Sequence, residues 1–154
     1  MQRKRKGEKI IFPDGSRLRI GIVISRYYED ITGSMLDGAL ETLEACGVRK
    51  KNIHVLPVPG SFEIPFGCLT FLKKKKYDAI ITLGCIIKGE TDHDRHIASA
   101  VFSGITNLSL DYGVPISLGV INANNLAQAK TRSAGDGNKG KDAALTAVIM
   151  ALTG

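Results

Sequence analysis

The sequence contains no tryptophan, and aromatic residues make up only 6% of its 154 residues. Hydrophobic residues still account for 44% and charged residues for 23%, which is ordinary for a globular protein. A chain of this length fits one domain and buries about two-thirds of its unfolded surface. We therefore expect a single domain whose core consists of Ile, Leu, Val and Ala side chains.

Long hydrophobic runs are also missing. No stretch approaches the roughly 18 consecutive apolar residues that a transmembrane helix requires. The N-terminal MQRKRKGEKIIF is charged, but neither a hydrophobic segment nor a cleavage site of small residues follows it, so it does not read as a secretory signal. We expect a cytoplasmic protein with no membrane partner.

Cysteine is scarce, and Cys46, Cys68 and Cys85 lie far apart within apolar stretches. A disulfide framework or a zinc site would need closer pairs or a histidine at ligand spacing. His93 and His96 have a spacing that two zinc ligands could use, but no third ligand is evident nearby. We expect reduced, buried thiols and no metal site.

The net charge is +6, and part of the excess lies in two basic runs, Arg3–Lys6 and Lys73–Lys76. Such runs can hold nucleic acid through its phosphates. A simpler interpretation is a solvated basic tail and a helix end whose cations suit the negative end of the macrodipole. The simpler interpretation is favoured, so nucleic acid is not an expected partner.

Strand-like and helix-like patterns alternate along the chain. Nearly continuous apolar runs, typical of strands covered on both faces, occupy 18–25, 52–58, 78–85 and 115–121. Apolar residues at helical spacing, or Ala-rich sequence, predict helices over 31–46, 61–75, 94–112, 125–131 and 141–152. The short connections predict one α/β domain over 16–154, with a four-stranded parallel sheet and helices on both faces, preceded by a basic segment over 1–15.

Ligands of such sheets bind beyond the carboxyl ends of the strands, so the loops there are the candidates for chemistry. After the first strand, Tyr27 and Tyr28 could offer a flat face to a heterocycle or pack over the core, and both interpretations stay open. After the second strand, Gly60 permits a tight turn, Ser61 could cap a helix, and Glu63 with nearby amides could bind a polyhydroxyl chain. On the pattern alone, simple helix capping is the favoured interpretation of this second loop.

The loop after the third strand, GCIIKGETDH, is the most informative one. Gly89 frees the backbone, and Thr91 could cap the following helix, whose N-terminus would then suit a phosphate group. Lys88 could add charge, although strand alternation points it away. His93 lies at the mouth of the loop, and a histidine ordinarily titrates near pH ~6.5, so it can give and take protons at neutral pH. A lone histidine is more often structural, but this position favours a catalytic role.

A glycine-rich segment lies late in the chain, RSAGDGNKG at 132–140. Three glycines with an arginine and a lysine are typical of a flexible anion-binding loop. No G-x-x-x-x-G-K-[ST] is present, and no G-x-G-x-x-G follows the first strand, which argues against a nucleotide P-loop and against a dinucleotide-binding fold.

The ordered segments SRYY, VPGSFEIP, DAIITLGCIIKGETDH, GVPISLGV and GNKG together resemble the lumazine synthase family over about residues 19–150. GSFEIP and KGETDH at this spacing are highly specific in combination. The resemblance implies a flavodoxin-like three-layer sandwich. It also implies condensation of 5-amino-6-(D-ribitylamino)uracil with 3,4-dihydroxy-2-butanone 4-phosphate to 6,7-dimethyl-8-ribityllumazine, the penultimate step of riboflavin biosynthesis, with release of phosphate and water and without a metal or cofactor.

The resemblance further implies roles for individual residues. Tyr27 would stack on the pyrimidine ring, and His93 would be the general acid–base. The other implied contacts are the pyrimidine pocket (Ile86, Ile87), the ribityl chain and ring edge (Ser61, Phe62, Glu63), the phosphate cradle (Gly89, Glu90, Thr91) and the neighbouring subunit's contribution (Leu118, Arg132, Lys139). Arg132 takes the place of the phosphate-binding arginine only with a one-residue gap in the alignment, and Thr131 falls there without the gap.

Members of the family form pentamers with active sites between subunits, and some assemble into 60-subunit shells. The resemblance therefore implies self-association, with Lys9–Pro13 adding a strand to a neighbour's sheet, and it makes riboflavin synthase a further candidate partner. Several positions depart from the family pattern: Tyr28, Asp94, Arg95, His96, Leu118 and Asn124. These departures keep a second interpretation open, namely a shell-forming or flavin-binding relative with weak or no turnover.

Overall fold

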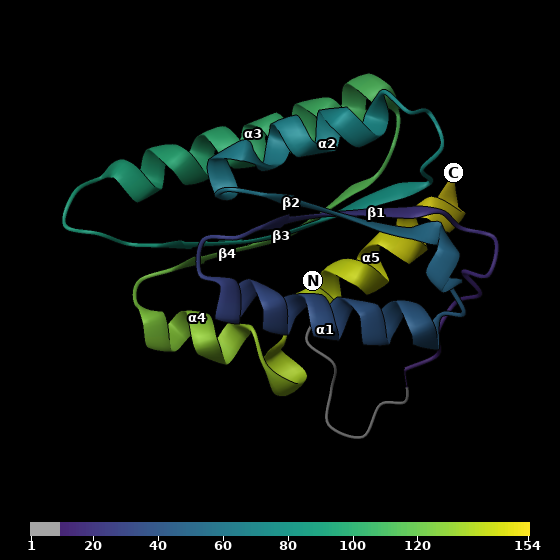
Figure 1. Cartoon of the computed structure of the whole chain (residues 1–154), viewed down its shortest axis with the longest axis horizontal. Coiled ribbons are helices and arrows are strands. Elements are labelled where there is room, and N and C mark those ends of the chain that lie inside the picture. Colours follow the sequence, from purple (N-terminus) through teal and green to yellow (C-terminus); the bar gives the residue numbers. More distant parts are fainter. Residues whose placement is uncertain (1–9) are drawn as a thin grey trace.

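The computed structural model describes residues 10–154 (Figure 1). The basic run Arg3–Lys6 and Lys9, the first residue of the expected extra strand, lie outside the described residues. The strands are β1 (Ile20–Ser25), β2 (Ile53–Val58), β3 (Ala79–Ile87) and β4 (Ile116–Ala123). The helices are α1 (Glu29–Ala45), α2 (Ile64–Leu72), α3 (His93–Tyr112), α4 (Leu126–Arg132) and α5 (Lys139–Thr153), with short 3₁₀ turns η1 (Lys50–Asn52), η2 (Ser61–Glu63) and η3 (Gly135–Gly137).

The four strands form one parallel sheet in the order β2-β1-β3-β4. Helices α2 and α3 cover one face, and α1, α4 and α5 lie on the other (Figure 1). This arrangement confirms the expected three-layer α/β fold. None of the helices described is long and apolar enough to cross a membrane.

Each face of the sheet has its own aliphatic core. Ile22 and Ile24 of β1 pack in the core beneath α1 and α5, whereas Val23 between them packs with α2 and α3. This alternation follows from the two-residue period of a strand. All three cysteines are buried with free thiols, as expected.

The edge strand β2 differs from the central strands. All residues of β1 and all but the last residue of β3 are buried, whereas β2 is half-buried and its Val55 is exposed. Pro57 cannot donate a ladder hydrogen bond, which suits the edge position that its presence predicted. Residues 10–15 form no strand in the chain's own sheet.

Helix α5 packs closely against α1 because of Gly140. A Cβ atom there would collide with the backbone carbonyl oxygen of Met35 on α1. Asn138 caps α5 by accepting a hydrogen bond from the Gly140 N–H at 2.8 Å, and its Nδ2 donates to the Ser34 carbonyl at 3.0 Å. The two helices are thereby tied together beneath the sheet.

Candidate active site

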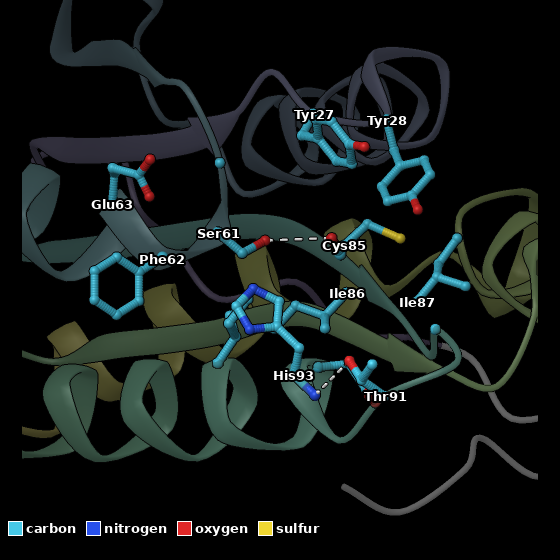
Figure 2. A pocket seen from close by; sticks show the side chains of 14 residues that line it. Tyr27, Tyr28, Ser61, Phe62, Glu63, Cys85, Ile86, Ile87, Thr91 and His93 are labelled. Carbon is cyan, nitrogen blue, oxygen red and sulfur yellow. Dashed lines mark hydrogen bonds between the residues drawn. The ribbon is translucent and has the colours of Figure 1, made fainter.

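A cavity of ≈ 480 Å³ opens at the carboxyl ends of β1, β2 and β3, where the topology predicts a ligand site. Figure 2 shows the side chains around it. The lining residues are Tyr27, Tyr28, Gly60, Ser61, Phe62, Glu63, Cys85, Ile86, Ile87, Gly89, Thr91, His93, Asp94 and Ile97. Nine of the residues predicted for the site from the sequence are therefore brought together in a single chain.

The loop between β1 and α1 forms an aromatic wall. The Tyr27 side chain is 67% exposed, and its backbone N–H donates to the Pro59 carbonyl at 3.0 Å. Tyr28 is half-buried and meets Tyr27 edge-on, with ring centroids 4.8 Å apart and an interplanar angle of 77°. Burial raises the pKa of the Tyr28 phenol, with smaller contributions from Tyr27 and Cys85.

The η2 turn lies against the end of β3. Ser61 was expected to cap the following helix, but this prediction is wrong: Ser61 makes no cap bond, and its Oγ instead donates to the Cys85 carbonyl at 3.3 Å. Gly84 permits this contact, because a Cβ there would lie 2.8 Å from Ser61 Oγ. The turn presents an exposed Phe62 and a half-buried Glu63 to the cavity (Figure 2).

Strand β3 extends farther than expected and supplies the apolar floor. Ile86 and Ile87 belong to the strand, paired with Asn122 and Ala123 of β4, rather than to the loop after it. Gly89 and Thr91 of the following loop reach the cavity, whereas Lys88 and Glu90 are exposed and do not line it.

His93 is the first residue of α3, one position earlier than the predicted helix start. Asp92 is the N-cap residue but makes no side-chain cap bond, and the Thr91 hydroxyl accepts a hydrogen bond from the His93 N–H at 3.3 Å. Thr91 thus accepts a hydrogen bond from one of the free backbone amides at the start of α3, which is the kind of contact expected of a capping residue. The exposed His93 lines the cavity, and its ring extends from the helix toward the other lining side chains (Figure 2).

Among the described residues, those that line the cavity include negative but no positive side chains. Its lining contains the carboxyl groups of Glu63 and Asp94 and neither lysine nor arginine. The Cys85 thiol is a poor nucleophile here, because burial, and secondarily Asp30, raises its pKa to about 11. No group of three or more His, Cys, Asp or Glu residues suited to a metal ion occurs within residues 10–154.

Besides Glu90, three predicted residues do not reach this cavity. Leu118 lies on β4 and is half-exposed. Arg132 ends α4, and its Nη1 donates to the Asn122 carbonyl at 3.2 Å. Lys139 is exposed at the start of α5. A site within one chain therefore lacks all three.

Five lining residues were not predicted as site residues: Tyr28, Gly60, Cys85, Asp94 and Ile97. Ile97 could have been found from helical spacing, because it follows His93 by four residues and so shares its face of α3. Cys85 carries no comparable signal in the sequence, since a buried cysteine at a strand end reads as core.

Comparison with known proteins gives consistent matches over most of the chain. The sequence model of the 6,7-dimethyl-8-ribityllumazine synthase family matches residues 17–153. A protein of that name from Buchnera aphidicola subsp. Baizongia pistaciae is 50% identical over 137 residues, covering 88% of this chain and 86% of the relative. One from Parabacteroides distasonis is 43% identical over 139 residues, covering 90% of this chain and 87% of the relative.

Proposed function

The chain belongs to the 6,7-dimethyl-8-ribityllumazine synthase family, and we propose that the family's reaction takes place in the cavity between β1, β3 and α3, with His93 transferring protons. The enzyme is a transferase. It condenses 5-amino-6-(D-ribitylamino)uracil with 3,4-dihydroxy-2-butanone 4-phosphate to 6,7-dimethyl-8-ribityllumazine and releases phosphate and water, the penultimate step of riboflavin biosynthesis.

One observation carries this assignment: an aromatic wall, an apolar floor, a carboxylate and an imidazole surround a single cavity. Its volume lies in the usual range of about 300–1,000 Å³ for small-molecule sites. Holding two reactants together in the right geometry can supply about 7–11 kcal/mol of the barrier. Positioning by the cavity is then the main source of the acceleration, and acid–base help from His93 is the smaller one.

The substrates are assigned to the cavity by the chemistry of its sides. Tyr27 stacks on the pyrimidine ring, above the floor of Ile86 and Ile87. Ser61, Phe62 and Glu63 hold the ribityl chain and the ring edge, since Glu63 accepts hydrogen bonds from hydroxyl groups. Gly89 and Thr91 line the cavity near the start of α3, where backbone amides favour an anion, and together with the backbone of Glu90 between them they are proposed to receive the phosphate. No cofactor is assigned a role in this reaction.

His93 is the group assigned to proton transfer. Imine formation and ring closure each need a proton removed from an amine and a proton delivered to a departing oxygen, and an imidazole can do both. The cavity's other ionisable groups suit this task less well, because Glu63 and Asp94 are carboxylates and the Cys85 thiol stays protonated. The assignment is supported by the place of His93 in the cavity lining, into which its ring extends from the start of α3 (Figure 2).

A neighbouring subunit is proposed to complete the site. A phosphate ester carries up to two negative charges, yet the described residues that line the cavity include two carboxyl groups and no lysine or arginine. We assign the missing positive charge to Arg132 and Lys139 of an adjacent copy, with Leu118 forming the far wall. All three side chains are exposed on the isolated chain, as residues that reach into a neighbour must be.

The wider assembly is proposed as a pentamer, with a 60-subunit shell as the larger alternative. The segment over 1–15 is proposed to add a strand to a neighbour's β2. Ile10, Ile11 and Phe12 are exposed in the isolated chain, and β2 is a free sheet edge. Beside that edge lies a groove with an apolar floor, lined by three acidic residues, Asp37, Glu41 and Glu44, and one basic residue, Lys50. The excess of negative charge is complementary to the basic residues of the segment.

Two further assignments concern the location of the protein and a partner protein. Free, buried thiols suit a reducing compartment, and we place the protein in the cytoplasm. Riboflavin synthase is proposed as a partner only because it follows in the pathway.

An absorbance assay for the lumazine product, with purified protein and both substrates, tests the proposed activity. Product must appear well above the uncatalysed rate. Intact assemblies that give no product above that rate would instead support the non-catalytic alternative, a shell-forming or flavin-binding relative.

A further inference from the structure

Tyr28 has a backbone conformation that aromatic residues rarely adopt. Its φ of 62° and ψ of 53° place it in the left-handed region, where a Cβ crowds the backbone. Within residues 10–154, the other non-glycine residue with positive φ is Lys75, in a turn after α2. Unlike Lys75, Tyr28 lines the cavity. Strained backbone of this kind persists where the surrounding structure fixes it, often at functional sites.

Hydrogen bonds fix the strained backbone at the start of α1. The Tyr28 carbonyl accepts bonds from the N–H groups of Ile31 and Thr32, each at 3.0 Å. The Thr32 hydroxyl donates to the carbonyl of Ser25 at 2.8 Å, which ties the first turn of α1 to the end of β1. The direction in which the Tyr28 side chain leaves the backbone is therefore set by the fold.

That direction brings the Tyr28 ring against Tyr27. Tyr28 packs on the core beneath α1 and meets the Tyr27 ring in the edge-on geometry that aromatic pairs prefer. The Tyr27 backbone is held by Pro59, but its side chain is 67% exposed. Among the described residues, the Tyr28 ring is the aromatic contact found for it. Tyr28 is thus well placed to limit the orientations that the Tyr27 ring samples.

We propose that Tyr28 is a positioning residue that holds the Tyr27 ring ready to stack on the pyrimidine substrate. The inference rests on the stacking role proposed for Tyr27. Pre-ordering an exposed ring lowers the entropy lost on binding. Because Tyr28 acts through Tyr27, its loss weakens binding of the pyrimidine more than it slows the chemistry.

A double-mutant cycle tests this inference. The variants are Tyr27→Ala, Tyr28→Gly, Tyr28→Asn, Tyr28→Phe and the double variant Tyr27→Ala/Tyr28→Gly. Gly and Asn both tolerate the left-handed backbone and remove the ring, so neither adds strain, whereas Phe keeps the ring. Thermal unfolding confirms that each variant is folded before KM and kcat are measured for each substrate.

The expected result is a KM for the pyrimidine raised about three- to tenfold in Tyr28→Gly and Tyr28→Asn, with a much smaller change in kcat and in the KM of the phosphate substrate. Tyr28→Phe restores the KM to within about twofold of the original. The double variant is no worse than Tyr27→Ala, because the effect of Tyr28 requires Tyr27.

Three outcomes overturn the inference. Unchanged KM in both ring-less Tyr28 variants, beside an impaired Tyr27→Ala, shows that Tyr27 needs no support. Effects that multiply in the double variant show that Tyr28 acts on the substrate independently of Tyr27. An unchanged KM in Tyr27→Ala removes the stacking role and this inference together, while product formation itself is still judged by the absorbance assay.

Discussion

Cys68 and Cys85 lie buried on opposite faces of the sheet, and burial raises the pKa of their thiols from 9.0 to about 12 and about 11, respectively. In the unfolded chain both thiols regain ordinary values. Above pH ~9 the unfolded thiols ionise while the folded ones stay protonated. The stability that these groups contribute is therefore complete below pH ~9 and is lost as the pH rises toward the folded values.

This residue-scale effect predicts that the free energy of unfolding falls between pH 9.5 and 11 by up to about 1.4 kcal/mol per pH unit for each such thiol. Urea unfolding at several pH values measures it. Cys68→Ala removes one of the two thiols, so its stability, though lower overall, declines less steeply by about that amount. Identical slopes for the variant and the original protein would contradict the burial of an un-ionised Cys68 thiol.

Among the site residues, sequence reasoning predicted the location of a residue where that location follows from its place at a strand end. His93, Tyr27 and Glu63 meet in one cavity because the carboxyl ends of parallel strands lie together. It failed for Ser61, whose hydroxyl bonds to Cys85, 24 residues later in the chain. A local capping pattern carries no information about such a distant partner.

At the scale of helices and strands, the apolar pattern placed every strand to within about two residues, because strands buried on both faces read as continuous apolar runs. Strands β3 and β4 both extend two residues beyond their predicted ends, where Ile86 and Ile87 of β3 pair with Asn122 and Ala123 of β4. That pairing depends on the register between strands, which a single apolar run does not specify. The 3₁₀ turn before α2 was likewise hidden within one apolar, helix-like segment.

Two glycines in the helical pair α1 and α5 predict opposite effects of the same substitution. Gly140→Ala destabilises the protein by about 2 kcal/mol or more, because the added methyl collides with the Met35 carbonyl, a backbone atom that cannot rotate away. Gly33 lies inside α1 with nothing within 4 Å of its would-be Cβ. Gly33→Ala is therefore expected to stabilise by up to about 1 kcal/mol.

Thermal and urea unfolding of both variants check this prediction. The two substitutions remove the same backbone freedom of a glycine, so their difference reports the contact between α1 and α5. Equal effects on stability would show that α5 does not approach α1 as closely as Gly140 allows.

At the scale of the whole molecule, the described residues that line the cavity include no lysine or arginine, although a phosphate substrate requires positive charge. We propose that Arg132 and Lys139 of an adjacent copy supply this charge. Only the assembled protein is then expected to be active. No sequence pattern within one chain distinguishes a residue that serves its own cavity from one that serves a neighbour's. The three residues predicted as a neighbour's contribution, Leu118, Arg132 and Lys139, share this ambiguity.

Subunit mixing tests the shared site. His93→Ala and Arg132→Ala each impair a different half of it, so assemblies of either variant alone have low activity. Dissociating and reassembling an equal mixture places an intact His93 beside an intact Arg132 at about one site in four of a head-to-tail ring. Activity of the mixture should rise well above that of both parents, with assembly size followed by light scattering. A mixture no more active than the average of its parents would place both residues in one subunit's site.

The central claim is that His93 transfers protons in this cavity, and the steady-state rate of His93→Ala tests it most directly. Because substrate positioning survives the change, kcat is expected to fall by about ten- to a thousandfold rather than to zero. His96→Ala is the matched control, since His96 is exposed on the same helix and does not line the cavity. A large loss in His93→Ala with little change in His96→Ala is the predicted result, and full activity of a correctly assembled His93→Ala enzyme would contradict the account.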